Sequence, residues 1–492
     1  MKSFLLPLEP QELDDFLVEI RESSPFNDIN ASAFFHLVKP TEENLRKYKL
    51  RCPKSKIFLT LAYLTLFPLI LLQSLSSIVI SFYSLLEFKS EKDLPSGKYK
   101  FLFLSHFTYA QDPKKEDVFF GKNLDFNESC AFFLNHTRLL SPQIKRKFYH
   151  VGKRKVAVNT KALSLFSMVE LQVAQLQISW WLFIKSLRGE SLDVTKRRLL
   201  IKAAFFQHRR STIANLVLRT RLRDTMIRVK PKFLVLTIEG HAHEKIVLDM
   251  SKKSFEDTKV IGYQHAPIVP GQLNLFRTVS NFSADDYFFT SGSVSKKLAL
   301  NHGLRCKVET LGSPKARLFE YQKKSTSIIQ VLVAPEGTRE SLSQFIKLIN
   351  ELAPSLPNIS FVLRSHPALG NLAYKMAKEK LFPRNGVSLS TASLSEDLRR
   401  SHLILFRSSA IGIEGLSFGV LPIHINQEGD DSLNPLISSE FETVGFRSVS
   451  EIIKFIKAFD LRLTQDETFQ KNCYRLFDGY FGKLQSINTL VH

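Results

Sequence analysis

Short apolar runs recur along most of the chain, and longer segments with apolar residues at helical spacing lie between them. A continuous apolar run bounded by polar loops is typical of a buried strand, whereas apolar residues three and four positions apart are typical of a helix packed on one face. Strands that alternate with helices form parallel sheets, so the pattern predicts an α/β protein. The runs predicted as strands are 98–107, 131–135, 233–238, 259–265, 286–292, 328–335, 359–364, 403–406 and 420–425. The segments predicted as helices are 160–187, 199–222, 294–301, 341–352, 373–381, 412–418, 449–459 and 466–483.

This alternation occurs twice, in two series separated near residues 312–326. A chain of 492 residues has room for two or three domains, each with a core of its own. We therefore expect two Rossmann-like domains that face a cleft. The expected order is a helical cap at 1–56, an apolar membrane-associated segment at 57–86, an N-terminal Rossmann-like domain at 95–312, a C-terminal one at 326–465, and a C-terminal helix at 466–492.

Polar residues follow two of the predicted strands of the C-terminal series. Arg364, His366 and Pro367 come at the end of the first, while Ser408 and Ser409 come at the end of the second. In parallel sheets ligands bind at the carboxyl ends of the strands, and the start of a helix adds free backbone N–H groups. These groups suit a phosphate, and the carboxylate of Glu414, about one turn into the next helix, suits a ribose hydroxyl pair. The pattern therefore predicts a nucleotide site.

Plainer readings stay open for each of these residues. A His-Pro pair ends a strand because proline breaks sheet pairing, and serines commonly cap helices. The loop with Gly337 and Thr338 follows the strand at 328–335, where glycine lets the backbone approach a phosphate, but an ordinary turn is equally compatible.

A second group of polar residues follows strands of the N-terminal series. Glu239 begins the loop Glu-Gly-His-Ala-His-Glu, and His265 ends the next strand. The H-E-x-x-H metal pattern is absent, so the loop indicates a solvated segment or an acceptor site and no metal. Glu239 and His265 are the candidate catalytic residues, although His265 also fits a hydrogen-bonded core histidine.

Charge points to a polyanionic partner. The chain has 68 Lys and Arg against 47 Asp and Glu, a formal net charge of +21. No motif of a nucleic-acid module accompanies the basic residues, so an anionic membrane surface is the expected partner and nucleic acid is not. The four cysteines show no C-x-x-C spacing, which argues against zinc and disulfides and fits a reducing compartment.

The segment Ile57–Leu86 carries no charged residue and is long enough to cross a bilayer, which takes roughly 20 apolar residues. Pro68 interrupts it, and serines recur in its second half at helical spacing. A basic cluster upstream favours a cytoplasmic start, so a single span would export the remainder. An enzyme that uses nucleotides must stay in the cytoplasm, so we expect a re-entrant or interfacial anchor. A buried helical hairpin broken at Pro68 is the alternative.

The Arg-x-His-Pro and Ser-Ser-x-x-x-x-Glu elements resemble the HP and SS motifs of bacterial transferases that use CMP-activated sugars, the sialyl- and Kdo-transferase type with a GT-B fold. The stretch from Glu239 to His265-Ala-Pro also resembles bacterial surface-carbohydrate biosynthesis proteins. The resemblance implies that Arg364, His366 and Pro367 lie on the phosphate side, and Ser408, Ser409 and Glu414 on the phosphate and ribose side. The acidic Asp/Glu-Asp/Glu-Gly motif of such sialyltransferases has no clean copy, since Asp112-Pro113 is a poor match and Glu239-Gly is its substitute.

The resemblance implies a metal-independent, inverting GT-B glycosyltransferase of surface polysaccharide biosynthesis, such as O-antigen of lipopolysaccharide or capsule. The acceptor would bind the N-terminal domain and the nucleotide donor the C-terminal one. Its donor would be a CMP-linked acidic sugar, its acceptor a glycan or a lipid-linked glycan, and its place the cytoplasmic face of the bacterial inner membrane, with no cofactor. A CDP-glycerol-type polyol-phosphate transferase and a non-catalytic membrane-associated assembly scaffold are the alternatives.

Overall fold

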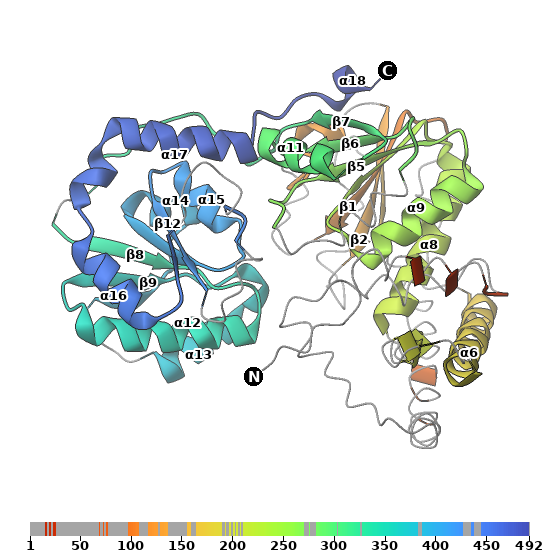
Figure 1. Cartoon of the computed structure of the whole chain (residues 1–492). Coiled ribbons are helices and arrows are strands. Elements are labelled where there is room, and N and C mark those ends of the chain that lie inside the picture. Colours follow the sequence, from red (N-terminus) through yellow and green to blue (C-terminus); the bar gives the residue numbers. More distant parts are fainter. Residues whose placement is uncertain are drawn as a thin grey trace. The chain divides into compact units, whose positions relative to one another are not determined.

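The protein is described from a computed structural model (Figure 1). Beyond residue 96 it describes residues 97–107, 117–125, 128–135, 155–158, 164–188, 192, 196–197, 200–201, 203–204, 207, 210–269, 275, 282–302, 304–324, 327–381, 386–426, 434–436 and 444–491, and before that residues 15–16, 19–20, 23–25, 68, 72 and 75–76.

The chain divides into two compact units. The first consists of Met1–Tyr263, Leu273–Phe288 and His302–Val308, and the second of Gln264–Gln272, Phe289–Asn301 and Glu309–His492. Most of residues 1–96 lie outside the described residues, and so do most of the predicted helical cap and the predicted membrane-associated segment.

The first sheet has seven strands in the order β3-β2-β1-β4-β5-β6-β7. The pairings of β1 with β2 and β4, of β2 with β3, and of β4 with β5 are parallel. Their bounds are β1 Phe101–Phe107, β2 Ser129–Asn135, β3 Lys155–Val158, β4 Phe233–Thr237, β5 Lys259–Gln264, β6 Tyr287–Thr290 and β7 Lys307–Thr310. β4 is buried along its whole length, as its apolar sequence predicts.

The second sheet has six strands in the order β10-β9-β8-β11-β12-β13, all paired in parallel. Their bounds are β8 Ile329–Val333, β9 Ile359–Leu363, β10 Val387–Leu389, β11 Leu403–Phe406, β12 Leu421–Ile425 and β13 Val444–Phe446. In both sheets the chain first builds outward on one side and then returns to the other side of the starting strand, which is the doubly wound Rossmann order. The predicted pair of Rossmann-like α/β domains is confirmed.

Helices lie between these strands and after the last one. In the first series they are α6 Leu165–Arg188, α8 Arg210–Val229, α9 Ala242–Ser254 and α11 Ser293–Asn301. Later in the chain they are α12 Arg339–Leu352, α13 Asn371–Lys380, α14 Leu394–Arg400, α15 Ile411–Leu416, α16 Val449–Ala458, α17 Glu467–Tyr480 and α18 Ile487–Leu490. No helix among these, or elsewhere in the part of the chain that is described, combines the length and the apolar character that a membrane span needs.

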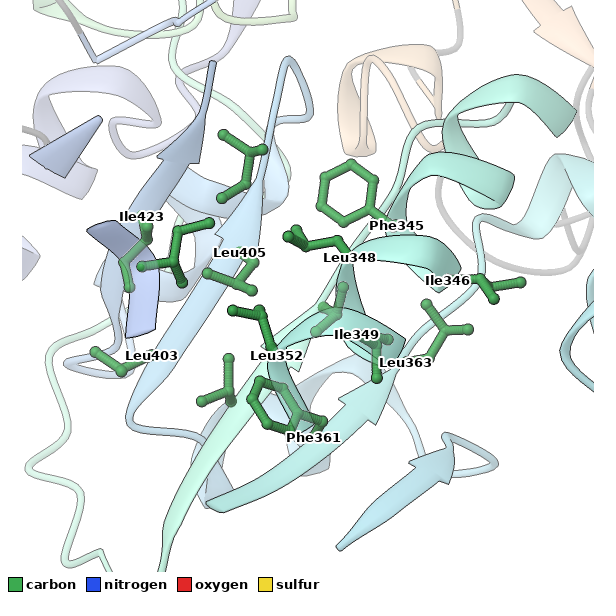
Figure 2. Close-up of a cluster of buried hydrophobic side chains, with 14 of the residues drawn as sticks. Phe345, Ile346, Leu348, Ile349, Leu352, Phe361, Leu363, Leu403, Leu405 and Ile423 are labelled. Carbon is green, nitrogen blue, oxygen red and sulfur yellow. The ribbon is translucent and has the colours of Figure 1, made fainter. Parts of the chain in front are cut away.

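The core of the second unit shows how one helix face covers the sheet. α12 begins at the N-cap Thr338, whose hydroxyl accepts a hydrogen bond from the backbone N–H of Ser341. Its apolar residues recur at helical spacing, so they form one stripe, which packs against Phe361 of β9, Leu405 of β11 and Ile423 of β12 (Figure 2). This packing fixes the loop at the start of α12 against the carboxyl end of β8. The buried stripe consists of Leu342, Phe345, Ile346, Ile349 and Leu352.

Candidate active site

Each sheet has one place where successive loops leave in opposite directions. In the first sheet it lies between β1 and β4, and in the second between β8 and β11. At such a switch point the loops separate, and ligands bind there outside the carboxyl ends of the strands. The predicted nucleotide residues follow strands of the second sheet, and Glu239 follows β4 of the first.

At the switch point of the second sheet, the carboxylate of Glu336 joins the two loops. Its Oε1 accepts hydrogen bonds from the backbone N–H of Ser408, at 2.9 Å, and from the Ser408 hydroxyl, at 3.0 Å. Its Oε2 accepts a hydrogen bond from the Ser341 hydroxyl in the first turn of α12. Glu336 therefore ties the end of β8 to the end of β11 and holds both Ser408 donors.

His366 reaches the same place from β9. A methyl group added at Gly337 would lie 2.8 Å from the imidazole Nδ1 of His366, so the ring rests directly against this glycine. Loss of solvation lowers the pKa of His366, the charge of Glu336 opposes this, and the charge of Lys315 adds to the lowering. The imidazole is consequently uncharged at neutral pH and offers one N–H donor.

Lys315 supplies the cation of this region. Its Nζ lies 2.7 Å from Oε1 of Glu414, whose side chain is largely buried on α15. The same ammonium lies over the ring of Phe481, 5.3 Å from its centre. Lys315 thus stands between a carboxylate and an aromatic face while its charge is felt at His366.

The remaining predicted nucleotide residues are placed as follows. Nη1 of Arg364 turns away toward β10, where it bonds Oδ2 of Asp397 at 2.6 Å and the carbonyl of Ala392 at 2.9 Å. Pro367 begins a short 3-10 turn after β9, and Thr338 is the exposed cap of α12. The hydroxyl of Ser409 accepts from the N–H of Ile411 at 3.4 Å, just before α15. The sheet thus brings together His366, Gly337 and Ser408, while Nη1 of Arg364 is bound by Asp397 and Ala392.

In the first unit, Glu239 stands at the start of a tightly built turn after β4. Glu244 is buried, and its carboxylate accepts the backbone N–H groups of Glu239, Gly240 and His241 at 2.8 to 3.0 Å. Gly240 has a φ of 85°, in the left-handed region that other residues rarely adopt. Burial raises the pKa of Glu244 to about 7, against the opposing effects of His241 and of the backbone hydrogen bonds.

The side chain of Glu239 itself is paired with a histidine. Oε2 of Glu239 lies 3.0 Å from Nε2 of His241, and about a quarter of the Glu239 side chain is exposed. The hydrogen bond to Glu239 is the main cause that raises the pKa of His241 to about 9, so the imidazole is charged at neutral pH. Glu239 is therefore a half-buried carboxylate with a cationic neighbour.

Two further histidines extend this group across the switch point. The ring of His243 stacks on His241 and meets His106 edge-on, each at 5.5 Å between centres. Nε2 of His106, near the end of β1, lies 2.8 Å from Oγ1 of Thr237, at the end of β4. The imidazoles contact each other through their rings, and within the described ranges no group of three or more metal-binding side chains is arranged to hold an ion.

Two further candidates are His265 and Asp112. His265 follows β5 directly, two residues after Tyr263, whose register partner in β4 is Thr237. Asp112 lies outside the described residues. The predictions of Glu239 and His265 as catalytic residues remain predictions.

The predicted site residues did not include Glu336, Lys315 and His106, nor the loop residues His241, His243 and Glu244. Glu336 directly precedes the predicted Gly337, and His106 ends the first predicted strand, so a strand-end rule applied to every strand would have included both. Glu244, three residues after the cap His241, fits the capping-box spacing. Lys315 had no such signal, because its role depends on a contact with a residue 99 positions away.

No protein-family model matches the chain, and no curated protein matches it in sequence. Solved structures follow its backbone over much of its length. A protein assigned as a UDP-N-acetylglucosamine 2-epimerase from Listeria monocytogenes is 12% identical, with a TM-score of 0.47 over 79% of this chain and 93% of that chain. The UDP-GlcNAc 2-epimerase from Neisseria meningitidis, bound to UDP-GlcNAc, is 14% identical, with a TM-score of 0.44 over 77% and 97%.

A third solved structure, the spinosyn rhamnosyltransferase SpnG with thymidine diphosphate, is 12% identical, with a TM-score of 0.39 over 77% of this chain and 96% of that chain. At these scores the likeness is a loose one of backbone course, and it assigns no activity to the chain.

Proposed function

We propose that the protein is a metal-independent, inverting GT-B glycosyltransferase of bacterial surface polysaccharide biosynthesis, with a CMP-linked acidic sugar as donor. The observation that carries the proposal is the meeting of Glu336, Ser408 and His366 at the switch point of the second sheet, with the Lys315–Glu414 ion pair in the same unit. An ammonium, an imidazole N–H and a serine hydroxyl are donors for phosphate oxygens, and the carboxylate of Glu414 suits ribose hydroxyls.

The proposed reaction uses these groups as follows. Glu239 takes the proton of the acceptor hydroxyl, whose oxygen attacks the anomeric carbon of the sugar. The bond from that carbon to the phosphate oxygen breaks, and CMP leaves with the bonding electrons. Lys315 and His366 stabilise the charge that develops on this phosphate. A single displacement inverts the anomeric carbon. The first unit supplies the base and the second binds the donor.

The proposed setting is the cytoplasmic face of the inner membrane, where a lipid-linked or glycan acceptor would be reached. The net charge of +21 supports an anionic surface as partner. Most of the apolar segment 57–86 lies outside the described residues, so its part as an anchor remains a proposal.

Calorimetry with CMP, CDP, UDP and GDP, followed by product analysis with the matching sugar donors, tests the proposal. Preference for CMP and transfer from a CMP-sugar are the expected results. Preference for CDP with transfer of a polyol phosphate would replace the proposal by the polyol-phosphate alternative. Absence of binding to all four nucleotides would leave the scaffold alternative.

We expect His366→Ala and Ser408→Ala each to weaken CMP binding about tenfold, because each removes a hydrogen bond to a charged phosphate. Calorimetry measures the change, and unchanged thermal unfolding shows that the fold is intact. His302→Ala removes an exposed histidine of the first unit and serves as the control. Unchanged affinity in both site variants would show that the nucleotide binds elsewhere.

Glu336→Gln should instead raise the affinity for the nucleotide. The Glu336 carboxylate occupies both donors of Ser408, so a phosphate that binds there must displace an anion from them. Glutamine keeps the size and removes the charge, so the nucleotide should bind roughly tenfold more tightly. Calorimetry at low and high salt measures this. Weaker binding by Glu336→Gln would mean that the carboxylate contributes to the ligand site directly.

A further inference from the structure

Two arginines of the second sheet stand directly after a strand. Arg364 follows β9, and Arg407 follows β11. Successive side chains of a strand point to opposite faces of its sheet. The face that each arginine occupies therefore follows from the residues before it, and that face determines which partners the arginine can reach.

On β11 the alternation places Arg407 on the face that α12 covers. Leu403 and Leu405 belong to the core beneath α12 (Figure 2). Ile404 and Phe406 pack on the opposite face, with residues of α14 and α15. Arg407 is the next residue of the first set, so it extends the α12 face at the carboxyl end of β11.

The neighbouring strand β9 shows that the alternation continues past a strand end in this sheet. Phe361 and Leu363 of β9 belong to the core beneath α12, whereas Val362 packs on the opposite face. Arg364 should accordingly lie on the side of α14. It does, because its Nη1 lies 2.6 Å from Oδ2 of Asp397, a buried residue of α14.

The two arginines differ in their partners. Arg364 has the carboxylate of Asp397, whereas the guanidinium of Arg407, also partly buried, forms no hydrogen bond or ion pair with any residue that the structure describes. Arg197 and Arg317 are partly buried as well, and they have a pair of carbonyls and an aromatic ring as partners. A guanidinium stays charged, and holding it partly out of water without a counter-charge costs free energy. An anionic ligand would supply the missing acceptor.

The other charged groups of this region are engaged elsewhere. Nζ of Lys315 lies 2.7 Å from Oε1 of Glu414. Oε1 of Glu336 accepts both donors of Ser408, the residue next to Arg407, and Oε2 accepts a hydroxyl of α12. The positive charge of Arg407 is therefore available at the same strand end as the Ser408 donors.

We propose that Arg407 binds the phosphate of the nucleotide donor through two parallel N–H···O hydrogen bonds. This role rests on the proposed function, and it is the role that the sequence pattern assigned to Arg364. The planar guanidinium fits two oxygens of one phosphate, which an ammonium cannot match. The ligand class is a phosphate ester of a nucleoside, and the same contact stabilises the charge that develops when the phosphate leaves.

Calorimetry of the full chain with CMP and with cytidine tests this role, because the two ligands differ only in the phosphate. Arg407→Ala should weaken CMP binding by roughly 100-fold and leave cytidine binding unchanged. Arg407→Lys keeps the charge but loses the paired geometry, so it should weaken CMP binding by roughly tenfold. Arg400→Ala is the matched control, since it removes an exposed arginine that precedes the same strand, and it should bind CMP normally.

Thermal unfolding separates a binding role from a structural one. Arg364→Ala leaves the buried Asp397 without its partner and should lower the unfolding midpoint. Arg407→Ala removes no internal bond, so its midpoint should equal that of the native chain.

Three results overturn the role of Arg407 while nucleotide binding by the native chain, and with it the proposed function, stands. They are unchanged CMP affinity in Arg407→Ala, an equal loss of cytidine affinity in that variant, and a midpoint lowered as far as that of Arg364→Ala. A native chain that binds no CMP would instead overturn the proposed function, and the role of Arg407 with it.

Discussion

Replacing Glu239 by glutamine is expected to slow sugar transfer by roughly two to four orders of magnitude, the range for loss of a general base. Glutamine keeps the size and the hydrogen bond to His241 but cannot take a proton. Since the donor is proposed to bind to the other unit, donor affinity should barely change. Initial rates with saturating donor, together with calorimetry of the nucleotide, measure the two quantities separately.

The proper comparison for Glu239→Gln is Glu256→Gln, an exposed glutamate in the turn between α9 and β5, at the opposite end of the strands. That variant should transfer normally. If Glu239→Gln also transferred at a near-normal rate, the base would have to be sought among other residues, with His265 and Asp112 first. Loss of donor binding in Glu239→Gln would instead contradict the division of roles between the units.

Glu244→Ala is expected to lower the free energy of unfolding by roughly 3 kcal/mol, because it leaves three backbone N–H groups, one buried and two part-buried, without this acceptor. The Glu239–His241 turn should also lose its fixed geometry, so transfer should fall with stability. Chemical unfolding measures the first effect. Glu451→Ala is the matched control, since Glu451 accepts backbone N–H groups in the same kind of capping box but is exposed, and its loss should be much smaller.

The pH dependence of the free energy of unfolding gives a second test of Glu244. Its pKa is about 7 when folded, above the ordinary value of 4.5, so the folded state binds this proton more tightly than the unfolded chain does. Its contribution to stability is full below pH 4.5 and is lost as the pH rises through about 7. Glu244→Gln lacks this titration, so the stability difference between it and the native chain should change across that window. A constant difference would contradict the raised pKa.

The inner strands of both sheets could be predicted from sequence, whereas the strands at their edges could not. β4, β5, β8, β11 and β12 are apolar runs because both of their faces are covered. The strands that the sequence analysis missed are β3, β7, β10 and β13, and each is the last strand on one side of its sheet. β10 and β13 have only three residues each, and β7 has exposed residues. Short, partly polar edges protect a sheet against pairing with other chains, and the same property hides them from an apolar pattern.

The helix ends were predictable only in part. The predicted helix at 412–418 is observed as α15, which begins at Ile411 and has six residues. The predicted helix at 199–222 overlaps α8, which ends at Val229. Apolar spacing locates a helix face well, but its ends depend on caps and on packing against residues far along the chain.

The residues of the candidate sites could also be predicted only in part. Residues that follow an apolar strand, such as Glu239, His366 and Ser408, could be selected one at a time, because the strand end is visible in the sequence. Their partners could not. The bond between Glu336 and Ser408 spans 72 residues and exists only because β8 and β11 are neighbours in the sheet. Arg364 illustrates the converse, since its strand-end position predicted a phosphate contact and its Nη1 is held by Asp397.

The two central strands of the first sheet lie far apart in the sequence. β1 pairs with β4 from Phe101 to Phe233, and the chain between them includes both α6 and α8. Bringing such distant segments together costs loop entropy before any pairing offsets it, so contacts of this kind form slowly. In the second sheet β8 pairs with β11 from Val331 to Leu403, a shorter separation. The unit that leaves the ribosome first is thus expected to complete its core later, and during this interval the edge of β1 that later pairs with β4 is exposed to aggregation.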